Sequence, residues 1–189
     1  MTLPGPQFPI VSTDELEAWL SEHHAEAGPT WVVVWKKHVQ DRHVSWGQVV
    51  PVLLRWGWID SRIRRVDDDR TAIRITRRKA GGTWSAVNKR HIAALEAGIG
   101  LAPPGRAVLE AAKKDGSWEF LDDIEALVEP PDLSAALDAL PAARQAWDAF
   151  PGSAKKAGLY SVKTAKRDKT RAARIAKLVA NAAIGKRPG

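Results

Sequence analysis

Cysteine is absent from this chain of 189 residues. The protein therefore has no disulfide, no thiolate metal site and no cysteine nucleophile. No stretch approaches the roughly 18 apolar residues that a membrane-spanning helix needs. The N-terminal sequence also lacks the basic segment and apolar run of a secretion signal. We therefore expect a soluble, cytoplasmic protein without a membrane span.

Motifs for common cofactors and metals are also missing. The sequence contains neither a P-loop nor a dinucleotide-binding glycine pattern. His23 and His24 are adjacent, so on a helix they would point about 100° apart. The loop residues His38, Asp41 and His43 lack a zinc-site spacing. We expect no cofactor and no metal site.

Charge is distributed unevenly along the chain. The net charge is +7, and 44% of the residues are hydrophobic, which is enough for a substantial core. Residues 1–100 carry 14 Lys and Arg against 11 Asp and Glu, residues 101–151 carry 4 against 10, and residues 152–189 carry 11 against 1. Two interpretations follow: the basic segment binds an anionic partner, or it docks on the acidic middle segment.

Two alternating runs predict an antiparallel hairpin. Residues 58–66 and 70–76 alternate between apolar and polar side chains on either side of an acidic triplet, residues 67–69, which we expect to be a solvated turn. The outward positions of the two strands should form a basic face, made by Arg62, Arg64, Arg74 and Arg78.

The rest of the sequence predicts an α+β fold, with a small antiparallel sheet of about three strands packed by helices. Residues 31–35 are apolar and β-branched or aromatic, as in a central strand. Helices should start at Thr13, at the capping box of Ser45 and at Ser85, while the first ten residues form an irregular arm. We assign residues 1–101 to an N-terminal α+β domain and residues 102–189 to a helical C-terminal extension.

The extension should end in a basic amphipathic helix over residues 155–184, either continuous or interrupted near Gly158. Small apolar residues gather on one side of its helical wheel. The opposite side carries Lys163, Lys166, Arg167, Arg171, Arg174 and Lys177. This side is either a solvated surface or a face that binds an anionic partner.

The hairpin ends hold the candidate binding residues. Asp60 either pairs with a neighbouring arginine or acts as a ligand-orienting carboxylate, and Ser85 and Asn88 either cap a helix or complete an anion pocket. No histidine or other base has an obvious sequence relation to Ser85, so no catalytic residue is assigned. Of the nine tryptophans, only Trp58 and Trp84 are expected to be exposed. The predicted ligand-binding set is Lys36, Lys37, Trp58, Asp60, Arg77, Arg78, Trp84, Ser85 and Asn88.

Three motifs resemble a bacterial family. WGWIDS at 56–61, TRRKAGGTWSAVN at 76–88 and AKRDKTRAARIAK at 165–177 are similar to YdeI/OmpD-associated proteins, which are also labelled bacteriocin-protection proteins. The resemblance covers most of the chain, from about Trp19 onward. It implies an N-terminal α+β fold like that of proteins that include frataxin-like iron chaperones. It also implies a role in survival against membrane-active or bacteriocin-like agents, with no established reaction.

We consider three functional hypotheses. The leading one is a non-enzymatic protein that binds an anionic small molecule or macromolecule and has a role in stress or in protection against bacteriocins. The second is an enzyme or small-molecule-binding stress protein with a cleft at the Trp58–Asp60 turn. The third is a protein that binds nucleic acid or another partner through its basic surfaces.

Overall fold

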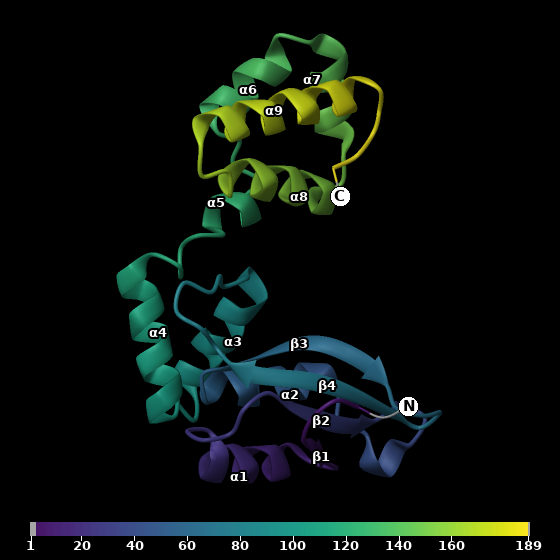
Figure 1. Ribbon diagram of the computed structural model, residues 1–189, viewed down its shortest axis with the longest axis vertical. Helices are drawn as coiled ribbons and strands as arrows, with labels where there is room; N and C mark the ends of the chain where they lie inside the picture. The colour runs from purple at the N-terminus through teal and green to yellow at the C-terminus, as the bar shows by residue number, and fades with distance from the viewer. Residues whose placement is uncertain (1–2, 189) are drawn as a thin grey trace. The chain divides into compact units, whose positions relative to one another are not determined.

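The computed structural model describes residues 3–188 and divides into two compact units, Met1–Glu119 and Phe120–Gly189 (Figure 1). The first unit combines a sheet with helices and the second is helical, which confirms the predicted α+β class. The predicted domain boundary after residue 101 falls between two helices of the first unit.

The elements follow one another in a simple order. The first unit contains β1 (Gln7–Pro9), α1 (Thr13–His23), β2 (Thr30–Trp35), a 3₁₀ turn (Gln40–Arg42), α2 (Trp46–Arg55), β3 (Trp58–Arg65), β4 (Arg70–Arg77), α3 (Ala86–Ala97) and α4 (Pro103–Asp115). The second unit contains α5 (Asp122–Glu125), α6 (Pro131–Asp138), α7 (Pro141–Ala149), α8 (Gly152–Lys163) and α9 (Asp168–Ala183). Within residues 3–188, no helix has the length and apolar character needed to cross a membrane.

The sheet has the strand order β1-β2-β4-β3. The predicted hairpin of β3 and β4 is confirmed, and β2 pairs antiparallel with β4. The expectation of an irregular N-terminal arm is wrong for residues 7–9, because β1 pairs in parallel with β2 and makes the sheet mixed. Prolines are compatible with this position because β1 is an edge strand, where one side of the backbone needs no partner.

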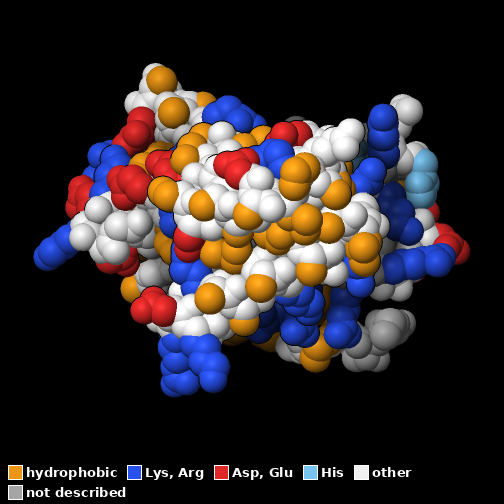
Figure 2. Space-filling view, turned by 90° about the horizontal axis from the view of Figure 1, so that it is seen from above, with side chains coloured by type: hydrophobic (Ala, Val, Ile, Leu, Met, Phe, Trp, Pro, Cys, Tyr) orange, Lys and Arg blue, Asp and Glu red, His pale blue; other side chains and the backbone are white. Residues whose placement is uncertain are grey.

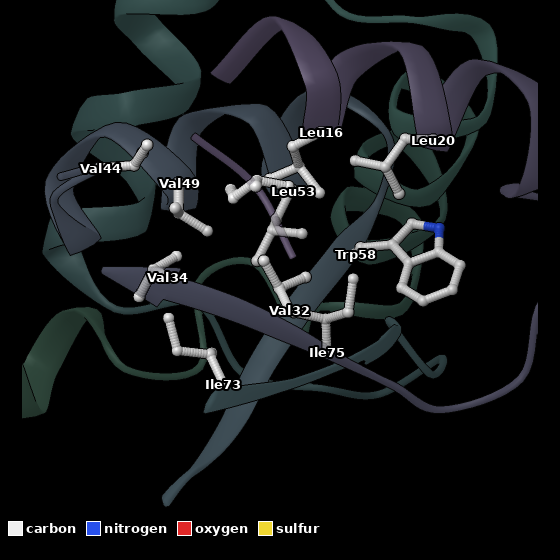
Figure 3. Packing of buried hydrophobic residues seen from close by; sticks show 11 residues of the cluster. Leu16, Leu20, Val32, Val34, Val44, Val49, Leu53, Trp58, Ile73 and Ile75 are labelled. Carbon is white, nitrogen blue, oxygen red and sulfur yellow. The ribbon is translucent and has the colours of Figure 1, made fainter. Parts of the chain in front are cut away.

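The main core lies between one face of the sheet and helices α1 and α2 (Figure 1). Figure 3 shows Trp58 of β3 pointing into this core beside Leu20 and Ile75. Ser12 begins α1 by accepting a hydrogen bond from the backbone N–H of Glu15, and Ser45 begins α2 with the predicted capping box. The caps fix where each helix starts, so that its apolar face meets the sheet.

A second cluster joins α2, α3 and α4 and contains Trp84, Ile92 and Leu109. α4 packs closely against the end of α2. A Cβ atom at Gly105 would collide with the carbonyl oxygen of Arg55, so only glycine fits there. The backbone N–H of Ala102 donates to the same carbonyl at 3.1 Å. The contact holds α4 against the helix that precedes the hairpin.

The second unit is held by its own core and by ion pairs. Trp147, Leu159 and Leu178 are buried at its centre. Three of its basic side chains pair with acids of the 122–132 segment, as Lys156–Glu125, Lys163–Asp123 and Arg171–Asp132. Figure 2 shows hydrophobic side chains exposed in the middle of one face. Part of the basic C-terminal segment therefore docks on acidic residues, one of the two interpretations of the charge pattern.

Residues 155–184 do not form a continuous helix, and the interruption does not lie near Gly158, because the chain breaks between α8 and α9 at residues 164–167. Arg171 donates to the carbonyl of Val162 and Arg174 donates to the carbonyl of Ser161, so two α9 side chains satisfy the end of α8. Free carbonyls at a helix end need such donors. The use of the remaining basic face by a partner stays a prediction.

Candidate functional site

Arg78 lies at the centre of the candidate site. It follows the last residue of β4, and its backbone N–H donates to the carbonyl of Gly57 at 2.9 Å. Its guanidinium carbon lies 3.7 Å from the centre of the Trp84 ring, and its Nη1 donates to the carbonyl of Thr83 at 3.3 Å. Only 9% of Arg78 is exposed. The prediction that Arg78 points outward is wrong, because β4 has ended at Arg77 and the chain folds back over Trp84.

The guanidinium of Arg78 is incompletely satisfied. Its Nε and Nη2 are buried and have no hydrogen-bond partner anywhere in residues 3–188. Burial lowers the pKa of Arg78 to about 10, while the charge of Asp60 acts in the opposite direction. Arg78 therefore stays protonated at neutral pH. A buried cation with free donors attracts an anion strongly, because little water screens its charge.

Arg78 borders a hollow of about 580 Å³, which we call the cationic hollow. No acidic residue lines it. Arg77 is held at its edge by a hydrogen bond from Nη1 to the carbonyl of Ala25, at 2.7 Å. The full lining is Ala27, Gly28, Pro29, Arg74, Thr76, Arg77, Arg78 and Lys79. The end of the hairpin thus concentrates positive charge around one concavity.

Arg78 also borders a second hollow of about 240 Å³, which we call the Trp84 hollow. One wall is the turn at Gly81 and Gly82, and another is a row of small residues on α4. The full lining is Arg78, Lys79, Ala80, Gly81, Gly82, Trp84, Ala107, Val108, Ala111, Ala112, Asp115 and Ser117.

Asp115 closes the rim of the Trp84 hollow. Its Oδ1 accepts a hydrogen bond from the backbone N–H of Ser117 at 2.8 Å, and its Oδ2 accepts one from the N–H of Gly81 at 3.2 Å. The hydrogen bonds from Ser117, and then that from Gly81, hold the pKa of Asp115 below its usual value. Asp115 therefore ties the 80–82 turn to the end of α4.

Lys36 and Lys37 do not reach this site. Lys36 follows β2, and its Nζ donates to the carbonyls of Asp67 and Asp68 at 2.8 and 2.9 Å. It therefore lies at the turn end of the hairpin, opposite the Arg77 end. The two ends are roughly 23 Å apart, at about 3.3 Å per strand residue. The structure does not bring these lysines together with Arg77 and Arg78.

The two tryptophans expected to be exposed are buried, so that expectation is wrong. Trp58 and Trp84 are each 1% exposed. Trp58 belongs to the main core, where its indole packs edge-on against Trp19, and its Nε1 has no partner among the described residues. Trp84 packs against Trp118 with ring centres 5.1 Å apart. Of the two, Trp84 lines the hollow named after it, and Trp58 lines neither of the two hollows described above.

The other predicted residues, Asp60, Ser85 and Asn88, line neither hollow. Asp60 pairs in register with Ile75 and is half-buried, and it makes no ion pair within the described part of the chain. Ser85 caps α3, its Oγ accepting a hydrogen bond from the backbone N–H of Asn88 at 3.2 Å. Arg74, Lys79 and Asp115 were missed, although the basic run after residue 74 was a visible signal for the first two.

Two family models match the chain. Residues 8–108, more than half of the sequence, match the family described as a domain of unknown function (DUF8412). This chain belongs to the DUF8412 family. Residues 126–185 of this DUF8412 chain match the family described as Bacteriocin-protection, YdeI or OmpD-Associated, which confirms the resemblance predicted from the sequence. Two of the motifs that carried the resemblance, at 56–61 and 76–88, lie in the DUF8412 match, and the third lies in the C-terminal match. No curated protein and no solved structure matches the chain.

Proposed function

We propose that the first unit of this DUF8412 protein binds an anionic ligand in the cationic hollow. The observation that carries the proposal is the lining, which holds four cationic side chains and no acidic one. A concavity lined by charge of one sign focuses the electrostatic field and attracts ligands of the opposite sign.

The cations of the hollow are available to a ligand. Within residues 3–188, neither Arg74 nor Lys79 makes an ion pair, and Arg77 uses Nη1 on a backbone carbonyl without losing its charge. Arg78 adds a buried positive charge behind them. The lining thus supplies hydrogen-bond donors and positive charge, which suits binding better than proton transfer.

The binding test uses tripolyphosphate as the probe and isothermal titration calorimetry as the readout. Replacing both Arg77 and Lys79 by Ala should weaken binding at least tenfold, because each lost charge-assisted hydrogen bond contributes about 1.5–3 kcal/mol. Wild-type affinity should also fall as salt rises from about 50 to 200 mM. A single-stranded DNA oligonucleotide serves as a second probe and separates a small-anion site from a nucleic-acid site.

The matched control replaces Arg62 and Arg90 by Ala. Both side chains are exposed on the same unit and line neither hollow, so the control removes the same net charge. Its affinity for tripolyphosphate should stay within about threefold of wild type, the change expected from long-range charge alone. Equal losses in the two double variants, or no binding by wild type, would refute the proposal.

We place this binding in protection against bacteriocins or related stress, the process in the description of the family matched at residues 126–185. A strain that lacks the gene and expresses the Arg77→Ala plus Lys79→Ala variant should then survive bacteriocin exposure as poorly as the strain that lacks the gene. A strain carrying the control variant should survive like wild type.

A further inference from the structure

Beyond the cationic hollow, we infer that the Trp84 hollow is a second site, which binds a compact monocarboxylate with an apolar body. The two hollows share Arg78 and Lys79 but differ in the rest of their lining. The cationic hollow is surrounded by positive charge, whereas the Trp84 hollow is walled mainly by an indole, alanines, a valine and glycines. A mostly apolar concavity with a few polar groups is the usual form of a small-molecule site.

The negative group of the ligand is assigned to Arg78. The side chain is nine-tenths buried, borders the hollow and keeps Nε and Nη2 without a partner among residues 3–188. These two nitrogens form one edge of the guanidinium, the edge that binds a carboxylate through two parallel hydrogen bonds. Trp84 supports the guanidinium from its face, while Nε and Nη2 are covered in this structure, so a ligand reaches them only after a local displacement of the groups that cover them.

Asp115 limits the charge of the ligand to one. Its carboxylate is ionised at neutral pH and lies at the rim of the hollow, where it repels a second negative charge. It does not pair with Arg78, whose Nε and Nη2 have no partner among residues 3–188; its oxygens accept hydrogen bonds from the backbone at Gly81 and Ser117. A phosphate dianion or a dicarboxylate is therefore disfavoured relative to a monocarboxylate.

The volume limits the size of the ligand. The hollow measures about 240 Å³, below the 300–1,000 Å³ typical of sites for drug-sized ligands. Its lining includes residues with little or no side chain, among them Ala107, Ala111 and the glycine turn. A larger residue on either side would take up the space for the ligand.

Benzoate is the probe, and benzamide is its neutral analogue of the same size. Binding is followed by the NMR signal of the Arg78 Nε–H, which should move on forming a hydrogen bond with a carboxylate. Benzamide should bind at least tenfold more weakly than benzoate, because it cannot form the paired charge-assisted bonds. Equal affinity for the two compounds, or an Arg78 Nε–H signal that does not move, would overturn the inference.

Two variants test the residues that carry the inference. Ala111→Leu fills the hollow, and Arg78→Lys keeps the positive charge but cannot bind bidentately, so each should weaken benzoate binding at least tenfold. Ala93→Leu is the control for the first variant, because Ala93 is an exposed helical residue that lines neither hollow. Unchanged benzoate binding in Ala111→Leu would also overturn the inference.

The experiment separates this site from the cationic hollow. Ala111 does not line the cationic hollow, so Ala111→Leu should leave tripolyphosphate binding unchanged. Replacement of Arg77 and Lys79 should reduce tripolyphosphate binding strongly and benzoate binding less. Loss of both ligands in Ala111→Leu, with the fold intact by circular dichroism, would overturn the assignment of two sites.

Discussion

The guanidinium carbon of Arg78 lies 3.7 Å from the centre of the Trp84 ring, and both side chains are buried. A cation over an aromatic face gains up to about 2 kcal/mol when it is shielded from water. That gain offsets only part of the cost of burying a charge whose Nε and Nη2 find no partner in the described chain. The arrangement is therefore costly for folding and well suited to receiving an anion.

The first prediction is that Arg78→Met costs little stability. Replacing a poorly satisfied buried charge by an apolar side chain of similar length is often neutral or stabilising. The free energy of unfolding should stay within about 1 kcal/mol of wild type, or rise, while anion binding is lost. Urea unfolding followed by tryptophan fluorescence measures this change.

Arg55→Met is the matched control for that experiment. Arg55 pairs with Glu17 and donates to the carbonyl of Gly100 at 3.2 Å. Arg55→Met should lower the free energy of unfolding by about 1–3 kcal/mol, because Glu17 and the carbonyl of Gly100 lose their hydrogen-bond donor. If Arg78→Met destabilised the protein as much as Arg55→Met, Arg78 would be a structural residue.

The second prediction concerns alkaline pH. Burial disfavours the charged form and lowers the pKa of Arg78 to about 10 in the folded protein, well below its value in the unfolded chain. Between these values the unfolded chain binds more protons, so stability rises with pH through this group. Wild type should therefore gain stability relative to Arg78→Met above pH 10, by at most about 1.4 kcal/mol per pH unit. The free energies of unfolding of both proteins are measured in urea from about pH 9 to 11.5. Groups that titrate alike in the two proteins cancel in the difference between these free energies. A difference that does not change with pH would contradict the burial of a charged Arg78.

Local patterns predicted much of the first unit. The alternation around residues 67–69 predicted the hairpin, and Ser45 and Ser85 predicted two helix starts. Both signals act over a few residues, so the sequence alone carries them. The strand over residues 7–9 was missed because its pairing with β2 depends on a distant segment.

The site was harder to predict because it depends on tertiary contacts. Alternation placed Arg78 on the outward face, but the strand had already ended and Trp84 covered the side chain. The walls at Ala107 and Ala111 come from α4, which no local pattern connects with the hairpin. Lys36 was grouped with Arg78 by charge, although strand direction sends them to opposite ends.

The third prediction concerns Asp115 at acidic pH. Hydrogen bonds from Ser117, and then from Gly81, hold the pKa of Asp115 below its ordinary value of 3.8. The ionised Asp115 therefore contributes to the free energy of unfolding at pH values above its pKa in the unfolded chain. This contribution is lost as the pH falls through the lower pKa of the folded protein. The amide signals of Gly81 and Ser117 should therefore shift together in NMR spectra, with a midpoint below 3.8. In Asp115→Asn this transition should disappear, and a midpoint above 3.8 in wild type would contradict the hydrogen bonds.

The fourth prediction compares two glycines in helices of the first unit. In Gly105→Ala the new methyl group would collide with the backbone carbonyl of Arg55, so α4 must move away from α2. Overpacking of this kind lowers the free energy of unfolding by about 1–3 kcal/mol. Because the backbone at Arg55 can move less than a side chain could, we expect a loss of about 2–3 kcal/mol in Gly105→Ala. Gly47 lies in α2 with open space around its Cβ position, so Gly47→Ala should instead stabilise by about 0.5–1 kcal/mol.

The same pair of variants links packing to binding. α4 carries the alanine wall of the Trp84 hollow, so displacement of α4 in Gly105→Ala should weaken benzoate binding even where the protein remains folded. Gly47→Ala leaves α4 in place and should bind benzoate like wild type. Chemical denaturation and NMR titration of both variants give the two measurements. A Gly105→Ala protein with full benzoate affinity would show that the position of α4 does not form the site.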